Sequence, residues 1–201
     1  MPFPTTEEFL VMLYERNHAE IVEEHLVSGL PFAFREDATT YDLLLDTLSQ
    51  ELHLGRESIT MVGSGRIGFS LSPEKFGTPF SPESDLDMLI VSEEFFDKAW
   101  FDMLKLGRRY PGLELRVRNW VDAHRENHIY WGFIQPDRLP GVVQIAAEWF
   151  RAFQGLSRHM ELARHEISGR LYRTWDHVRV HQLHTLRMIQ RSRASEQRGS
   201  R

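Results

Sequence analysis

Apolar and polar residues alternate along this chain with two different periods. Over six stretches the apolar residues recur every three or four positions, which is the spacing of one buried face of an α-helix. These stretches predict helices at residues 6–27, 40–54, 93–109, 120–131, 141–153 and 176–191. Thr5 or Thr6 is the expected N-cap of the first helix, and Gly29 and Pro31 are expected to end it.

Shorter apolar runs predict strands at residues 58–62, 85–91, 113–118 and 167–175. No internal repeat or low-complexity linker interrupts the pattern. The sequence therefore predicts one α/β (α+β) domain over residues 1–191, in which N-terminal helices and further helices flank a small mixed sheet. Residues 192–201 are polar and basic, and we expect them to form a flexible tail.

Two carboxylates open the second predicted strand. Asp85 and Asp87 are two residues apart, so a strand would project both from one face, about 7 Å apart. At that separation they can bind one divalent cation or a pair of cations. Upstream, Gly63 and Ser64 end the first predicted strand with small residues that let the backbone approach a phosphate. The pattern predicts chemistry on a phosphate that is held together with a metal.

Gly63-Ser64 followed by Asp85-x-Asp87 resembles the signature of the DNA polymerase beta-like nucleotidyltransferase superfamily, mainly over residues 59–91. The resemblance implies transfer of a nucleoside monophosphate from an NTP or dNTP to a hydroxyl, with Mg²⁺ or Mn²⁺ as cofactor. It also implies that Gly63 and Ser64 hold the triphosphate and that Asp85 and Asp87 are metal ligands. Small stand-alone bacterial members of this type occur in toxin/antitoxin or antiviral defence cassettes, which implies a protein partner encoded nearby.

The chain departs from that signature in two ways. The gap from Ser64 to Asp85 is long and contains three prolines, so an irregular loop is expected there. A third carboxylate, which active members usually take from a later strand, is not obvious. Glu114 is the first candidate, because alternation in the strand predicted at 113–118 places it on the polar face, and Glu166 is the second.

Arginines are candidates for binding the triphosphate through forked hydrogen bonds. Arg170 is the central polar residue of the last predicted strand, and Arg66 and Arg173 are the other two candidates. If the last predicted strand is the one that should supply the third carboxylate, its central polar residue is Arg170 and that carboxylate is missing. An alternative hypothesis is therefore a catalytically degenerate nucleotidyltransferase-like nucleotide sensor or partner-binding regulator, and a third is a purely structural interaction module.

Other interpretations of these motifs stay open at this stage. Residues 63–68 match G-x-G-x-x-G, the dinucleotide-binding pattern, although Pro73 follows too soon for the required helix. Asp85 and Asp87 are also ordinary turn and strand-entrance residues. His177, His181 and His184 share one predicted helix face, where they form either a zinc or nickel site or scattered polar positions.

Composition narrows the function classes. The 201 residues are 41% hydrophobic and 26% charged, which is typical of a globular protein. Without cysteine, disulfides, thiolate metal sites and cysteine nucleophiles are excluded. No apolar run is long enough to span a bilayer and the start lacks a secretory leader, so we expect a cytoplasmic protein without membrane contact.

The net charge of −5 argues against a surface that coats nucleic acid, and only a local contact is expected. Arginines recur through residues 151–201, so this basic C-terminal region is the candidate for such a contact; a solvated helix face is the alternative. Most aromatic residues are expected in the core. Tyr172, beside Arg170 and Arg173, is the candidate for stacking on a nucleobase.

Overall fold

A computed structural model describes residues 3–141, 143–159 and 165–199 of the chain. Within these residues, four strands form one mixed sheet in the order β1-β2-β4-β3. The strands are β1 (Ile59–Val62), β2 (Leu86–Val91), β3 (Phe133–Ile134) and β4 (Ile167–Tyr172). β2 pairs in parallel with β4, whereas the β1–β2 and β3–β4 pairs are antiparallel. The predicted α+β fold with a small mixed sheet is confirmed.

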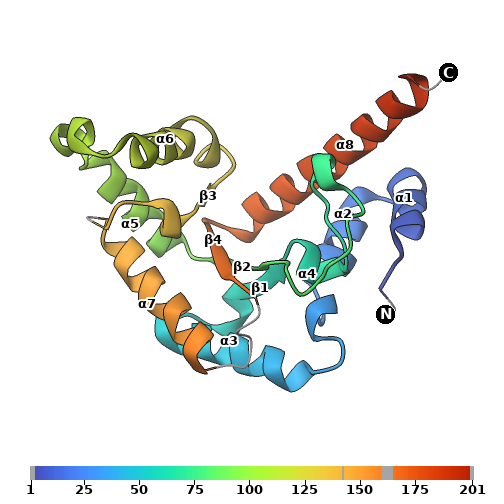
Figure 1. Ribbon diagram of the computed structural model, residues 1–201, viewed down its shortest axis with the longest axis horizontal. Coiled ribbons are helices and arrows are strands. Elements are labelled where there is room, and N and C mark those ends of the chain that lie inside the picture. Colours follow the sequence, from blue (N-terminus) through green and yellow to red (C-terminus); the bar gives the residue numbers. More distant parts are fainter. Residues whose placement is uncertain (1–2, 142, 160–164, 200–201) are drawn as a thin grey trace.

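Helices surround this sheet (Figure 1). They are α1 (Thr6–Glu15), α2 (His18–Ile21), α3 (Ala38–Leu52), α4 (Ser64–Ile67), α5 (Glu93–Leu104), α6 (Leu115–Ala123), α7 (Gln144–His159) and α8 (Trp175–Gly199). α3 and α7 lie side by side next to the sheet, and α8 passes α1 and α2 on the other side of the molecule (Figure 1). In the described ranges, no helix has the length and apolarity needed to cross a membrane.

The two faces of the sheet differ in chemistry. Met88 and Leu171 point into the main core with α3 and α7. Gly169 lies on this face because a Cβ there would be 2.5 Å from ring atoms of Phe153 and Trp149. Their neighbours along β2 and β4 point the other way, and this opposite face carries Asp87 as well as buried apolar side chains.

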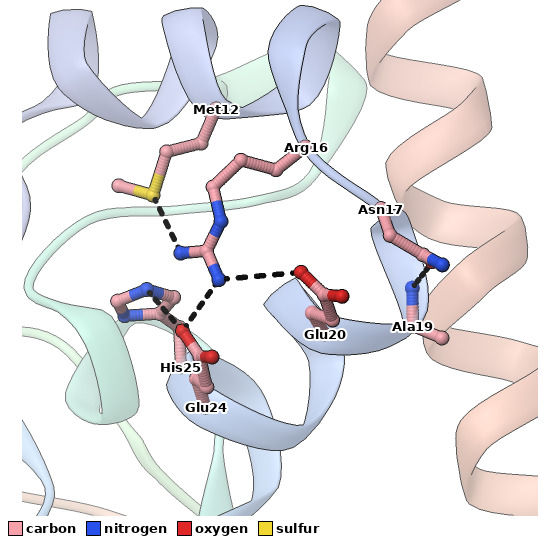
Figure 2. Close-up of polar contacts among 7 residues, drawn as sticks. All are labelled: Met12, Arg16, Asn17, Ala19, Glu20, Glu24 and His25. Atoms are coloured by element: carbon pink, nitrogen blue, oxygen red, sulfur yellow. Dashed lines mark hydrogen bonds and ion pairs between the residues drawn. The ribbon is translucent and has the colours of Figure 1, made fainter.

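The N-terminal helical region is interrupted, which the sequence pattern did not predict. Thr5 caps α1 through a capping box with Glu8, as expected. The helix then ends at Glu15, and the side chain of Asn17 caps a new one by accepting the N–H of Ala19 at 2.8 Å (Figure 2). A π-helical segment, Val22–Val27, continues from α2. The single helix predicted at residues 6–27 is therefore wrong.

The strand predicted at residues 113–118 is also wrong, because this segment enters α6. Leu115 is 65% exposed, and the buried position is Val121, one helical turn after Val117. Alternation over so few residues does not distinguish a strand from a helix. The strand β3 and the short helix α4 were not predicted. Among the predicted elements, β4 ends earlier than expected, at Tyr172, and α7 runs from Gln144 to His159.

At the C-terminus, α8 continues to Gly199, beyond the expected end of the helix at residue 191. Part of the arginine-rich region serves the fold itself. Arg179 pairs with Glu23 at 2.5 Å, and the guanidinium of Arg193 lies 4.9 Å from the ring centroid of Phe76. These contacts attach α8 to N-terminal segments and to the loop between β1 and β2.

Candidate functional site

The acid pair and the glycine-serine turn are neighbours. Asp87 lies opposite Val62 in the antiparallel register of β1 and β2, and Gly63 follows Val62 directly. A Cβ built on Gly63 would lie 2.4 Å from Oδ2 of Asp87, so this carboxylate packs on the glycine. Asp85, two residues earlier, is exposed at the entrance to the strand. The structure thus brings together the two halves of the sequence motif.

Gly63 and Ser64 lead into the short helix α4 and are partly exposed. Gly63 has φ +72°, a conformation that side chains rarely allow. The long segment before Asp85 folds back towards the turn, because Phe69 pairs with Pro79 and Phe80 donates its N–H to the carbonyl of Gly68 at 2.8 Å. The long segment between Ser64 and Asp85 therefore does not separate the two halves of the motif.

Asp87 is half-buried and has polar neighbours on β4. The hydroxyl of Ser168 donates to Oδ1 of Asp87 at 3.2 Å. Burial raises the pKa of Asp87; the positive charge of Arg170 and the Ser168 hydrogen bond lower it, and the charge of Asp85 raises it further. Since the ionised carboxylate is poorly stabilised by the protein alone, a cation at Asp85 and Asp87 would stabilise it. Two adjacent carboxylates are also oxygen donors of the kind that Mg²⁺ takes.

Glu114, the first candidate for the third carboxylate, is not on the sheet. It lies exposed before the first residue of α6. Glu166 lies just before β4, and its carbonyl accepts the N–H of Leu86 at 2.9 Å. If the parallel register is extended by one residue, Glu166 lies opposite Asp85. By strand periodicity, the side chain of Glu166 is then on the same face of the sheet as that of Ser168. Its side chain is exposed, and in the described residues no three His, Asp or Glu side chains are grouped closely enough for a metal site.

The three candidate arginines lie in different places. Arg170, two residues after Ser168 on β4, is near enough to Asp87 to lower its pKa. Arg173 instead pairs with Asp97 on α5 at 3.0 Å. Arg66 is buried and donates from Nη1 to the carbonyl of Gly29 at 2.7 Å. Of these three, the structure brings Arg170 alone to the acid pair.

An aromatic and histidine-rich layer continues the same face beyond Arg170, and sequence reasoning missed it. The Tyr172 hydroxyl and Nδ1 of His181 are 2.6 Å apart, and His181 stacks on Phe133 with ring centroids 5.1 Å apart. Burial lowers the pKa of His181 and of His128 to about 4, so both are neutral at pH 7. These contacts link β3, β4 and α8, which are far apart in sequence.

Tyr172 does not fit the role of a base-stacking platform. It is 1% exposed and belongs to a buried cluster with Phe133, and burial raises its pKa to about 12. The three histidines expected on one face of α8 each contact a different neighbouring side chain. His181 bonds Tyr172, His184 packs on Trp131 and His177 is paired with the Thr174 hydroxyl at 2.7 Å.

Asp87 leads to a prediction about pH. Its raised pKa means that the folded state holds the proton more tightly than the unfolded chain, so ionisation at neutral pH costs stability. Asp87→Asn removes that charge, and we expect the metal-free variant to melt at a higher temperature than the wild type at pH 7. The gain should shrink as pH falls through the folded-state pKa and vanish near pH 3.8, the ordinary value. Scanning calorimetry from pH 8 to pH 4 tests this, and a gain that grows on acidification contradicts it.

Comparisons of the chain with protein-family models, with curated proteins and with solved structures find no significant match.

Proposed function

We propose that the chain is a magnesium-dependent nucleotidyltransferase that transfers a nucleoside monophosphate from an NTP or dNTP to a hydroxyl acceptor. The observation that carries this proposal is the contact of Asp87 with Gly63, with Asp85 two residues earlier, directly before the first residue of β2. Two carboxylates that could bind a metal therefore lie next to a turn that could admit a phosphate. The superfamily resemblance of the motif agrees with this geometry.

Each residue has a defined task in this proposal. Asp85 and Asp87 would hold Mg²⁺ or Mn²⁺, which supplies charge neutralisation on the triphosphate and the departing pyrophosphate when bound. Gly63 would let the backbone approach the triphosphate closely, and Ser64 would supply a hydroxyl that hydrogen-bonds to it. Arg170, on the same face as Asp87, would bind a phosphate oxygen. Glu166, directly before β4, would receive the proton of the acceptor hydroxyl.

A second candidate function is nucleotide binding without turnover, by a sensor or a regulator of a partner protein. A specific feature of β4 favours it. The positions of that strand beside the acid pair are Ser168 and Arg170, and neither is a carboxylate. Transfer without a carboxylate on β4 would depend on the exposed Glu166 at its start.

One experiment separates these functions. The purified protein is incubated with each α-labelled NTP and dNTP, with Mg²⁺ or Mn²⁺, and with protein, RNA-end or nucleotide acceptors. Pyrophosphate release with transfer of label supports the transferase. Magnesium-dependent binding without release, measured by calorimetry, supports the sensor. Absence of magnesium-dependent nucleotide binding contradicts both and leaves an interaction module.

The proposal extends to the biological setting. The stand-alone type that the motif resembles would act with a protein encoded nearby, in a toxin/antitoxin or antiviral defence cassette. The basic C-terminal region would contribute a local contact if the acceptor is an RNA end. Co-purification with the product of a neighbouring gene, and comparison of RNA with protein acceptors, test these two parts.

A further inference from the structure

A cavity of about 550 Å³ lies apart from the acid pair, between α4 and the π-helical segment Val22–Val27. Its wall includes Arg66, Arg35 and His25, together with apolar side chains such as Leu30 and Ile67. Asp85, Asp87 and Ser64 are not among the described residues that line it. The cavity is therefore distinct from the proposed nucleotide site.

Arg66 is a buried cation without a countercharge in the described part of the chain. Its side chain is 2% exposed, and none of the ion pairs among the described residues includes it. Nη1 donates to the carbonyl of Gly29, whereas Nε and Nη2 are buried without a hydrogen-bond partner. Burial lowers the pKa of Arg66, whereas the charge interaction and a hydrogen bond with the Tyr41 side chain raise it. A buried charge of this kind needs an anion to be stable.

The carboxylates in the cavity wall already have partners. Glu24 accepts a hydrogen bond from Arg16 at 2.8 Å, and the same guanidinium lies 3.6 Å from Glu20 (Figure 2). Glu23 pairs with Arg179 at 2.5 Å. Arg35 lies 3.6 Å from Glu36, so of the two arginines in the described cavity wall it is Arg66 that has no carboxylate partner.

We infer that this cavity binds the phosphate group of a small molecule. The unpartnered Nε and Nη2 form one edge of the Arg66 guanidinium, and such an edge can bind two oxygens of one phosphate. Both atoms are covered in this structure, so binding requires the guanidinium to turn towards the cavity. Arg35 supplies a second guanidinium in the same wall, which suits a dianion. The apolar residues of the wall leave room for an organic body attached to the phosphate. This inference does not depend on the proposed transferase activity.

The test uses inorganic phosphate and phenyl phosphate in the presence of EDTA, so that metal-dependent binding at the acid pair does not contribute. We expect both to raise the thermal midpoint of the wild type saturably, by at least about 3 °C beyond NaCl at equal ionic strength. Phenyl phosphate should bind more tightly if the natural ligand has an organic body, and equally if it is free phosphate. A midpoint that follows ionic strength alone overturns the inference.

Variants locate the binding. Arg66→Met should fold, because it replaces an unpaired buried charge by an apolar side chain of similar length, and it should lose the phosphate response. Arg35→Ala should weaken binding at least tenfold and provides the test if Arg66→Met does not fold. Arg151→Met, at an exposed arginine on α7, is the matched control and should respond like the wild type, as should Asp85→Asn/Asp87→Asn. An unchanged response of Arg66→Met and Arg35→Ala places the binding elsewhere and overturns the inference.

Discussion

Replacing Asp87 by asparagine is expected to lower the rate of the proposed nucleotidyl transfer about 1,000-fold or more, because a metal clamp supplies several kcal/mol of transition-state stabilisation. The amide keeps the size of the carboxylate and its capacity to accept the Ser168 hydrogen bond, but not the negative charge. Magnesium-dependent binding of the nucleotide should weaken with it. Initial rates of pyrophosphate release and calorimetric titrations with and without Mg²⁺ measure the two effects.

The matched control changes a carboxylate outside the site. Asp46→Asn on α3 breaks a surface ion pair with Arg56 and should leave both binding and rate unchanged. Ser168→Ala should have a smaller effect than Asp87→Asn, since it removes a hydrogen bond and keeps the charge. Wild-type rates in Asp87→Asn, with Asp46→Asn also unchanged, would show that Asp87 does not bind the metal.

The local part of the candidate site could be predicted from sequence. Asp85 and Asp87 are two residues apart at the entrance to β2, a spacing that strand geometry assigns to one face. The contact of Asp87 with Gly63 follows from the antiparallel pairing of neighbouring strands. Such relations extend over a short stretch of chain, where side-chain period and turn residues decide the structure.

What the sequence could not predict depends on long-range pairing. Ser168 is 81 residues from Asp87, and only the β2–β4 register brings it there. Arg66 was one of three arginines considered as candidates for binding the triphosphate. Two residues on a helix differ in direction by about 200°, so α4 turns Arg66 away from the side of Ser64.

Gly63→Ala is expected to lower the thermal midpoint by roughly 5–10 °C, which corresponds to about 2–3 kcal/mol in a domain of this size. Two effects add. The backbone at Gly63, with φ +72° and ψ −159°, lies in a region of φ and ψ that is favourable only for glycine. The new Cβ would also lie 2.4 Å from Oδ2 of Asp87 and displace that carboxylate. Magnesium-dependent nucleotide binding should therefore weaken together with stability.

Other glycines of this chain separate the two effects. Gly29→Ala has φ +81° and open space around its Cβ, so it reports backbone strain alone, and Gly112→Ala has open space without a positive φ. We expect midpoint losses in the order Gly63→Ala, Gly29→Ala, Gly112→Ala. In a double-mutant cycle, Gly63→Ala should cost less in the Asp87→Ala background, because the clashing oxygen is gone. Equal losses for Gly63→Ala and Gly29→Ala, with no coupling to residue 87, would mean that the carboxylate does not pack on the turn, and the geometric basis of the proposed site would fail.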